Sequence, residues 1–323
     1  MTSEAWLKQA YFSCEKIARK NRPYLYLVAR YFEDREKYRA FCSTYASMRI
    51  IDDKIDSIPF RGRMSAVNRI RFIQEVQGWL EEVVACQNKS SSPEPIFIAL
   101  QDTFGKFPMP LFPWENLALA MQKDVGKDCF ASFKEFINYA EGAAVAPATV
   151  FMFLLTAQRD GNGYIWHYPP KQIQAFAREL ALFCYLTHVI RDVASDLELG
   201  KSGLLYLSAQ DLKRYRLNKE DLKEFQKSRR VNEGFRKLAA KYIERARSFE
   251  KRGRNLLQKL NPNLSKDSKF ILDLLLEFYA QTLKKIAKVR YNVFSGKEKL
   301  TQTEENNLVR KVAKKWGVRV RDV

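Results

Sequence analysis

The sequence predicts an all-α protein. Apolar residues recur at three- and four-residue steps along nearly the whole chain, which is the spacing of one helix face. The alternation of apolar and polar residues that marks strands is nearly absent. Only 13 Gly and 11 Pro are spread over 323 residues, too few for an all-β protein with a turn about every ten residues. No linker separates two units, so we expect one domain over residues 1–323.

The helical segments follow one another between turn signals. Residues 64–87 are typical, because Ile70, Ile73, Val76 and Leu80 repeat at helical spacing. The Ser- and Pro-rich stretch 86–95 then forms a loop, and GNGYIWHYPP breaks the pattern again at 161–170. We expect helices over 4–20, 34–56, 64–87, 95–105, 114–126, 131–158, 171–198, 209–216, 219–227, 232–259, 266–292 and 301–316.

The longest uncharged stretch, residues 142–158, contains Pro147 and several small residues. A spanning helix needs about 20 predominantly apolar residues, so we interpret this stretch as a buried core helix. Residues 1–20 are polar and amphipathic, unlike a secretory signal. We expect a cytoplasmic location, with the basic tail over about 310–323 either resting on the inner face of an acidic membrane or solvated.

The charge balance is strongly basic, with 56 Lys and Arg against 37 Asp and Glu and a formal net charge of +19. Such an excess attracts nucleic acid, acidic membranes or phosphorylated substrates. Two His in the chain exclude a His-rich metal site. Five widely separated Cys without a CxxC pair exclude zinc ribbons and thioredoxin-type motifs. We expect free, buried thiols.

Two acidic clusters carry the chemistry. In RIIDDKID (49–56), Asp52 and Asp56 are four residues apart on one helix face, and Arg49 lies on the same face. In THVIRDVASD (187–196), Asp192 and Asp196 repeat this spacing beside Arg191. A single such pair is usually a solvated helix face. Two pairs in apolar helices, each with an arginine, instead favour Mg²⁺ ions that bridge to a diphosphate.

Other catalytic templates are absent from the sequence, including GxGxxG, the Walker loop, GxSxG and HExxH. Residues 284–294 offer only a weak pattern of interleaved basic and aromatic residues. We therefore do not expect nucleic acid as a partner. A helical nucleic-acid-binding protein stays the most distant alternative.

The two clusters resemble the aspartate motifs of the squalene/phytoene synthase family. YASMRIIDDKID (45–56) is similar to its first motif and THVIRDVASD to its second, in the family's order. Between and after them, NYAEGAAVAP (138–147) and YLSAQDLKRY (206–215) resemble further family segments. The resemblance covers roughly residues 10–310. It implies a single-domain helical bundle of the isoprenoid-synthase type with a central apolar cavity.

The resemblance also implies roles for individual residues. It places Asp52, Asp56, Asp192, Asp196 and Tyr139 in the catalytic machinery. It implies diphosphate binding by Arg49, Arg191, Tyr279 and Lys297. It implies metal binding by Asp52, Asp53, Asp56, His188, Asp192 and Asp196. Cavity walls would come from Ala144, Ala148, Phe151 and Phe183. Cation stabilisation by Phe151, Phe153, Phe176 and Phe183 competes with plain core packing as the role of these rings.

The implied reaction is the Mg²⁺-dependent head-to-head condensation of two farnesyl or geranylgeranyl diphosphates. It passes through a cyclopropyl diphosphate to a C30 or C40 hydrocarbon of the squalene, dehydrosqualene or phytoene type. No nucleotide motif is visible, so reduction of the product by NADPH stays open. The alternatives are a terpene cyclase or one-step variant on the same fold, and a non-catalytic prenyl-diphosphate binder.

One departure from the family bears on the metal. His188 occupies the position of the family's usual Asn in the second motif. A neutral imidazole binds metals, but Mg²⁺ prefers oxygen ligands. His188 therefore leaves the number of metal ions open, and it is alternatively a polar core residue with a backbone partner.

Overall fold

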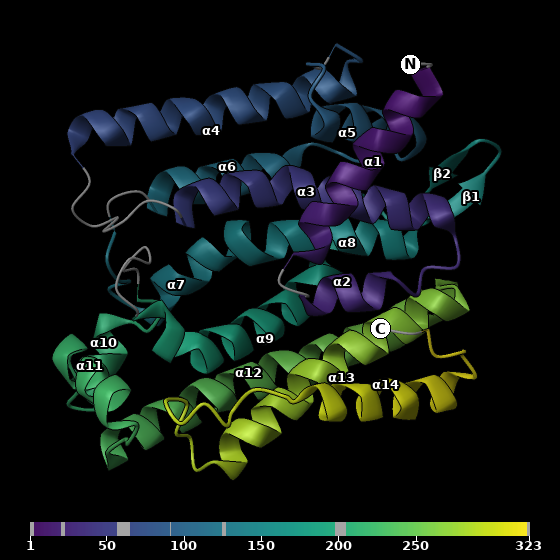
Figure 1. Ribbon diagram of the computed structural model, residues 1–323. Coiled ribbons are helices and arrows are strands. Elements are labelled where there is room, and N and C mark those ends of the chain that lie inside the picture. The colour runs from purple at the N-terminus through teal and green to yellow at the C-terminus, as the bar shows by residue number, and fades with distance from the viewer. Residues whose placement is uncertain are drawn as a thin grey trace.

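The computed structural model describes residues 3–20, 23–56, 65–90, 92–124, 127–197 and 205–321. It confirms the all-α prediction (Figure 1). The α-helices are α1 Ser3–Arg19, α2 Tyr24–Ala29, α3 Arg35–Asp56, α4 Ala66–Gln87, α5 Pro95–Lys106, α6 Phe112–Asp124, α7 Phe133–Ala140, α8 Ala146–Thr156, α9 Pro170–Asp196, α10 Ala209–Arg214, α11 Lys219–Ser228, α12 Glu233–Leu260, α13 Lys266–Lys288 and α14 Gln302–Trp316. Two short turns, η2 Glu141–Val145 and η3 Asn261–Asn263, and two strands, β1 Gln158–Asp160 and β2 Gly163–Ile165, complete the described elements.

The long helix α9 runs through the middle of the bundle (Figure 1). It packs along α12 on one side and against α8 and α13 on others. Helix α3 lies on α8, and α1 and α5 pack outside α3. Helix α13 in turn contacts α2 and α14. Helices α3 and α9, which carry the two acidic clusters, therefore face the same interior, with α8 between them.

The segment predicted as one helix over 131–158 is interrupted by a π-helical turn, η2. Gly142 in this turn packs so closely on α6 that a Cβ atom there would lie 2.4 Å from the Asn116 carbonyl oxygen. Arg178 Nε on α9 donates to Glu141 Oε1 at 2.7 Å, which ties the turn to its other neighbour. Pro147 falls in the first turn of α8, where its missing N–H is tolerated. Wide turns of this kind often occur at functional sites.

The break predicted at 161–170 contains a feature that the sequence pattern did not indicate. Strands β1 and β2 form an antiparallel hairpin in which Gln158 pairs with Ile165. Gly161 at its turn has a φ of +55°, a conformation that favours glycine. Tyr164 stacks on Phe107, and its hydroxyl donates to Asp34 at 2.6 Å. The short helix α2 is a second element without a predicted counterpart.

One described segment, Phe133–Thr156, is long and apolar enough to cross a membrane by length and composition. However, 67% of its most apolar window is buried inside the structure. Residues Met152–Leu155 are all buried. The segment therefore packs as the core helix that the sequence analysis predicted.

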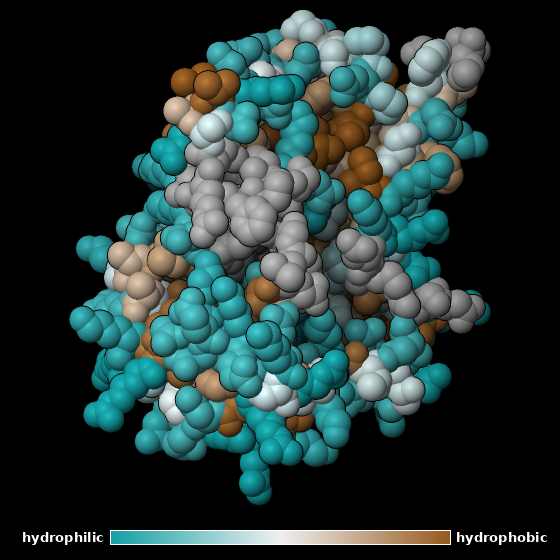
Figure 2. Space-filling view, turned by 60° about the vertical axis from the view of Figure 1, so that its left-hand side comes forward, coloured by the Kyte–Doolittle hydropathy of each residue, from teal (hydrophilic) through white to brown (hydrophobic). Residues whose placement is uncertain are grey.

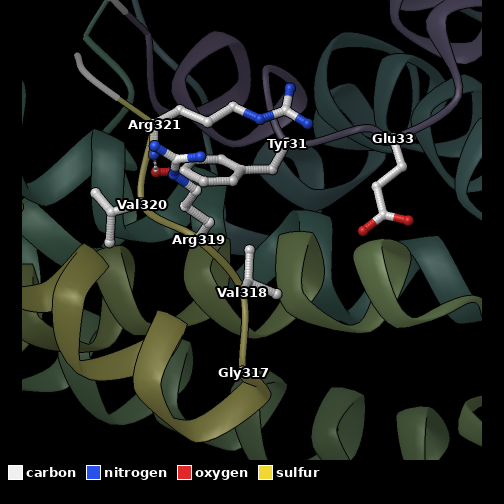
Figure 3. A pocket seen from close by; sticks show the side chains of 7 residues that line it. All are labelled: Tyr31, Glu33, Gly317, Val318, Arg319, Val320 and Arg321. Atoms are coloured by element: carbon white, nitrogen blue, oxygen red, sulfur yellow. Dashed lines mark hydrogen bonds between the residues drawn. The ribbon is translucent and has the colours of Figure 1, made fainter.

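The basic region predicted as a tail begins as helix. Its residues 310–316 form the last turns of α14, whose buried face includes Val309 and Val312. Beyond Gly317 the chain turns back across Tyr31 (Figure 3). There the Arg321 guanidinium lies 5.7 Å from the centre of the Tyr31 ring. All five cysteines are free; Cys129 and Cys184 are partly exposed and the others are buried.

Candidate active site

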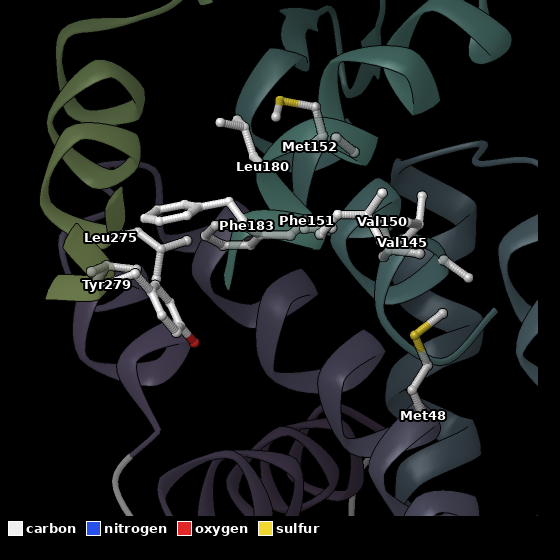
Figure 4. Packing of buried hydrophobic residues seen from close by; sticks show 14 of the residues in the cluster. Met48, Val145, Val150, Phe151, Met152, Leu180, Phe183, Leu275 and Tyr279 are labelled. Atoms are coloured by element: carbon white, nitrogen blue, oxygen red, sulfur yellow. The ribbon is translucent and has the colours of Figure 1, made fainter. Parts of the chain in front are cut away.

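The main cavity has a volume of about 430 Å³ and is lined by α2, α3, α7, α8, α9 and α13 together with the η2 turn. Its deep wall is apolar, with Met152, Leu180 and Leu275 around it (Figure 4). Its polar wall carries Asp52 from α3 and both Asp192 and Asp196 from α9. Two acidic clusters that lie about 140 residues apart in the sequence thus meet at one apolar cavity.

One face of α9 lines the main cavity, and its residues change from apolar to charged along the helix. Because residues three and four apart share a helix face, a single stripe runs from apolar to charged along the cavity. The apolar end of the stripe is buried, and its charged end lies half-buried in the last two turns of the helix. The stripe consists of Ala177, Leu180, Ala181, Cys184, Tyr185, His188, Val189, Asp192 and Asp196.

In the first cluster, Arg49 holds two carboxylates. Its Nη1 donates to Asp52 Oδ2 at 2.6 Å, and its Nη2 contacts Asp53 Oδ1. Burial disfavours the charged guanidinium, but Asp52 and Asp53 outweigh it and raise the pKa of Arg49. The three side chains are about one-third to two-fifths exposed. Arg49 is thus a fixed positive charge that remains accessible to an anion.

In the second cluster, Arg191 grips Asp192 with two hydrogen bonds, from Nε to Oδ1 at 2.8 Å and from Nη2 to Oδ2 at 2.5 Å. The same Nη2 donates to His188 Nδ1 at 2.6 Å. His188 Nε2 lies 2.5 Å from the hydroxyl of Tyr279 on α13. This cluster is more buried than the first, since the Arg191 side chain is only 16% exposed.

Burial and neighbouring charges shift the pKa values of three side chains in this second cluster. Burial disfavours the Asp192 carboxylate, but the hydrogen bonds and the positive charge of Arg191 hold the pKa of Asp192 well below its usual range. Burial and the Arg191 charge both lower the pKa of His188. Burial raises the pKa of Tyr279 well above its ordinary value. The cluster therefore contains a carboxylate, a neutral imidazole and a protonated phenol.

A smaller cavity of about 170 Å³ adjoins the first. Both cavities are lined by Asp52, Arg49 and Phe151. Met48 and Leu117 line only the smaller one. The Phe151 ring packs edge-on against Phe41, with their centres 5.6 Å apart. Two apolar spaces therefore share one charged entrance, and Phe151 forms part of the wall between them.

The structure brings most predicted site residues to the main cavity. Those that line it are Arg49, Asp52, Tyr139, Ala144, Ala148, Phe151, His188, Asp192, Asp196 and Tyr279. Asp53 and Arg191 contact this set through their ion pairs. The side chain of Asp56 lies outside the described residues.

Two predicted site residues lie elsewhere. Phe183 is fully buried behind Tyr279, with ring centres 6.2 Å apart, and lines neither cavity. Lys297 is exposed and also lines neither cavity. Gly296 beside it adopts a φ of +75°, and the chain here buries Glu298 instead. Of the other proposed cation-stabilising rings, Phe153 and Phe176 are core residues outside both cavities.

Sequence reasoning missed several cavity residues. Tyr45 lines both cavities, and Tyr185 and Tyr206 line the main one. Helical spacing could have found two of them, because Tyr45 precedes Arg49 by four residues and Tyr185 precedes His188 by three. Glu298 lines neither cavity but was also missed; its Oε2 is buried without a hydrogen-bond partner among the described residues.

The donor set suits a hard divalent cation. Asp52, Asp192 and Asp196 offer carboxylate oxygens at one cavity, and Mg²⁺ prefers oxygen ligands and keeps several waters. In the part of the chain that the structure describes, no three acidic, His or Cys side chains already converge on one point. These carboxylates would therefore need a diphosphate or water to complete the coordination.

A helical bundle with two such clusters at one apolar cavity defines a prenyltransferase of the isoprenoid-synthase fold. The family model for squalene/phytoene synthase matches residues 18–304, and the chain belongs to this family. Its members join two prenyl diphosphates head to head, and their chemistry is typically dependent on divalent metal.

Individual relatives are distant. The chain is 24% identical over 300 residues to a phytoene synthase from Arthrospira platensis, covering 91% of this chain and 89% of that protein. The fold is shared with a dehydrosqualene synthase crystallised with a ligand, at a TM-score of 0.77 and 20% identity over 96% of this chain and 98% of that chain. It is also shared with squalene synthase HpnC from Alicyclobacillus acidocaldarius, at a TM-score of 0.69 and 19% identity, covering 88% of this chain and 96% of that chain.

Proposed function

We propose that this protein condenses two farnesyl or geranylgeranyl diphosphates in a Mg²⁺-dependent reaction to a C30 or C40 hydrocarbon. The observation that carries the proposal is the meeting of two Asp–Arg clusters, from α3 and α9, at one pair of adjoining apolar cavities. The similarity to a phytoene synthase supports the C40 product. Two proteins of similar fold are named dehydrosqualene synthase and squalene synthase, so the C30 product is a second candidate that the assay must distinguish.

The polar wall and the apolar wall of the main cavity would act on different parts of the substrate. Mg²⁺ held by Asp52, Asp192 and Asp196 would supply positive charge to the departing diphosphate. Arg49 and Arg191 add fixed positive charges beside these carboxylates. Such preorganised charges stabilise an anion that develops as the bond breaks. The apolar wall around Leu180 and Leu275 keeps water away from the allylic cation that remains.

Incubation with Mg²⁺ and either diphosphate, with and without NADPH, tests this function. Hydrocarbon product and released diphosphate are both measured. We expect a C30 or C40 hydrocarbon that is lost in Asp52→Ala and in Asp192→Ala. Exposed Asp160→Ala in β1 serves as the matched control and keeps activity. Tight diphosphate binding without turnover under every metal would contradict the proposal and favour the binder, whereas a cyclopropyl or cyclic product would favour the one-step variants.

We also propose a peripheral position at the cytoplasmic face of an acidic membrane, where the oily product must go. The exposed face of α14 carries Arg310, Lys311, Lys314 and Lys315, while its apolar face is buried. Contact would therefore be electrostatic and weaken with salt. Co-sedimentation with phosphatidylserine vesicles at low and high salt measures it.

We expect that the double variant Lys311→Glu/Lys314→Glu binds phosphatidylserine vesicles more weakly than the wild-type protein. Lys223→Glu with Lys227→Glu on α11 makes the same charge change at other exposed positions. Equal loss in both pairs would show a general charge effect and contradict a specific role for α14. The face of the molecule drawn in Figure 2 is mostly hydrophilic, with separate hydrophobic patches.

A further inference from the structure

A chain of hydrogen bonds joins Arg191, His188 and Tyr279 across the main cavity wall. Arg191 Nη2 lies 2.6 Å from His188 Nδ1, and His188 Nε2 lies 2.5 Å from Tyr279 Oη. His188 belongs to α9 and Tyr279 to α13, so the chain connects two helices that pack together. Both His188 and Tyr279 line the cavity.

The chemistry of the donors fixes the direction of this chain. Arginine is always protonated and only donates, so His188 Nδ1 must accept from Arg191. The imidazole is then neutral with its proton on Nε2, and Nε2 donates to Tyr279 Oη. Tyr279 Oη has no other hydrogen-bond partner among the described residues. The phenol proton of Tyr279 is therefore left for an acceptor in the cavity.

We propose that His188 is a positioning residue that orients the Tyr279 hydroxyl as a hydrogen-bond donor to the departing diphosphate. The inference rests on the proposed function, since it needs a diphosphate at this cavity. It also gives His188 a role different from the metal ligation suggested by its place in the motif. Both ring nitrogens are already used by Arg191 and Tyr279, and Mg²⁺ prefers oxygen ligands.

The orientation matters because a hydroxyl is a rotor with both donor and acceptor capacity. Without His188, the Tyr279 proton could turn toward other acceptors. When His188 Nε2 donates to Tyr279 Oη, the hydroxyl proton of Tyr279 points away from His188 and toward the cavity. A donor that is aligned before the reaction needs no reorganisation as negative charge develops on the diphosphate.

The matched variants are His188→Leu and His188→Gln. Leucine removes both hydrogen bonds at similar size, whereas a glutamine amide can accept from Arg191 through oxygen and donate to Tyr279 through nitrogen. We expect His188→Leu to lower kcat by about tenfold to a hundredfold, the range for losing a hydrogen bond to a charged group, with little change in KM. We expect His188→Gln to recover most of this loss. Equal losses in both variants would overturn the proposal.

A double-mutant cycle with Tyr279→Phe separates positioning from general damage. In the Tyr279→Phe background, His188→Leu should cause no further loss in kcat. The same fold-loss in both backgrounds would show that His188 does not act through Tyr279. The Mg²⁺ concentration for half-maximal activity should stay unchanged in His188→Leu. A large increase confined to His188 variants would instead assign His188 to the metal.

Calorimetric binding of inorganic diphosphate with Mg²⁺ keeps the test independent of turnover and of folding in any one variant. His188→Leu and Tyr279→Phe should weaken this binding by similar factors, and His188→Gln should not weaken it. If the wild-type protein makes no hydrocarbon but these binding results hold, the proposed function fails and the positioning role stands. If wild-type turnover is normal and all three variants bind alike, the positioning role fails alone.

Discussion

Gly253 on α12 lies directly against Leu180 on α9, so that a Cβ atom at residue 253 would come within 2.4 Å of Leu180 Cδ2. Leu180 also lines the main cavity. The side chain of Leu180 thus lies between the contact with α12 and the main cavity. The width of the cavity at this point depends on the absence of a side chain at residue 253.

Gly253→Ala is expected to push Leu180 into the cavity. Leu180 Cδ2 is the end of a flexible side chain that can turn aside, and alanine is favoured over glycine inside a helix by about 1 kcal/mol, so the free energy of unfolding should change little. The variant should lose about tenfold in kcat/KM for geranylgeranyl diphosphate, with a smaller loss for farnesyl diphosphate, since one methyl group can discriminate at this level. Steady-state kinetics with both substrates measure the ratio.

Gly78→Ala on α4 is the control for that substitution, because nothing lies within 4 Å of its added Cβ. Adding Leu180→Ala to Gly253→Ala should restore kcat/KM for the longer substrate, geranylgeranyl diphosphate. A uniform loss for both substrates that Leu180→Ala does not relieve would contradict the steric explanation.

Phe151→Leu should open the wall between the two cavities that Phe151 lines together. We expect relative kcat/KM to shift toward geranylgeranyl diphosphate. Leucine is chosen because a Phe→Ala change in a core costs about 3–5 kcal/mol. Phe153→Leu, in a buried ring outside both cavities, is the matched control. An equal shift in the control would show a general packing effect.

Glu298→Gln should stabilise the protein at neutral pH. Burial raises the pKa of Glu298 above its ordinary value of 4.5, and nearby Asp192 adds to this effect. Ionisation of Glu298 therefore opposes folding, so its contribution to stability is present below pH 4.5 and is lost as pH rises through the raised value. Glutamine removes that ionisation.

Thermal unfolding from pH 4 to pH 8 checks the sign for Glu298. The Tm gain of Glu298→Gln should be greatest at pH 8, on the order of 2 °C, and should shrink in acid. The exposed Glu81→Gln on α4 should show no such trend. A Tm gain that grows toward acid would contradict the assigned direction of the pKa shift.

Gly142→Ala should destabilise the fold. The added Cβ would lie 2.4 Å from the Asn116 carbonyl oxygen and 2.5 Å from Ala120 Cβ, and a backbone oxygen cannot easily move aside. We expect a loss of about 1–3 kcal/mol in the free energy of unfolding, typical of overpacking. Urea unfolding measures it, with Gly105→Ala, which meets no atom within 4 Å, as the control. Unchanged stability would show that α6 yields to the methyl group.

The sequence indicated the parts of the site that follow helical spacing. Asp192 and Asp196 share a face with His188, so their convergence on one cavity follows from the period of α9. Lys297 and Glu298 lie in an irregular loop without such a period. There a single residue's positive φ, at Gly296, helps decide which side chain points inward. Pattern reasoning has no access to that angle.

The hydrogen-bond chain at His188 was also beyond sequence reasoning. His188 and Tyr279 are separated by 91 residues, and only the packing of α9 on α13 brings them together. The hairpin β1–β2 escaped prediction for a related reason. Its strands have three residues each, too few for alternation to appear, and tertiary contacts such as Tyr164 on Phe107 hold it in place.

The π-helical turn at Glu141–Val145 makes the shape of the cavity depend on the number of residues that precede α8. Each residue advances an α-helix by about 100°, so the wider turn changes the phase of everything that follows it. Ala148 and Phe151 reach the cavity wall from α8 only with that phase. Because a π-helical turn accommodates about one residue more than an α-helical turn, deleting one residue from 141–145 is expected to convert η2 into α-helix and to leave this wall in place, whereas deleting two residues is expected to rotate the wall away from the cavity.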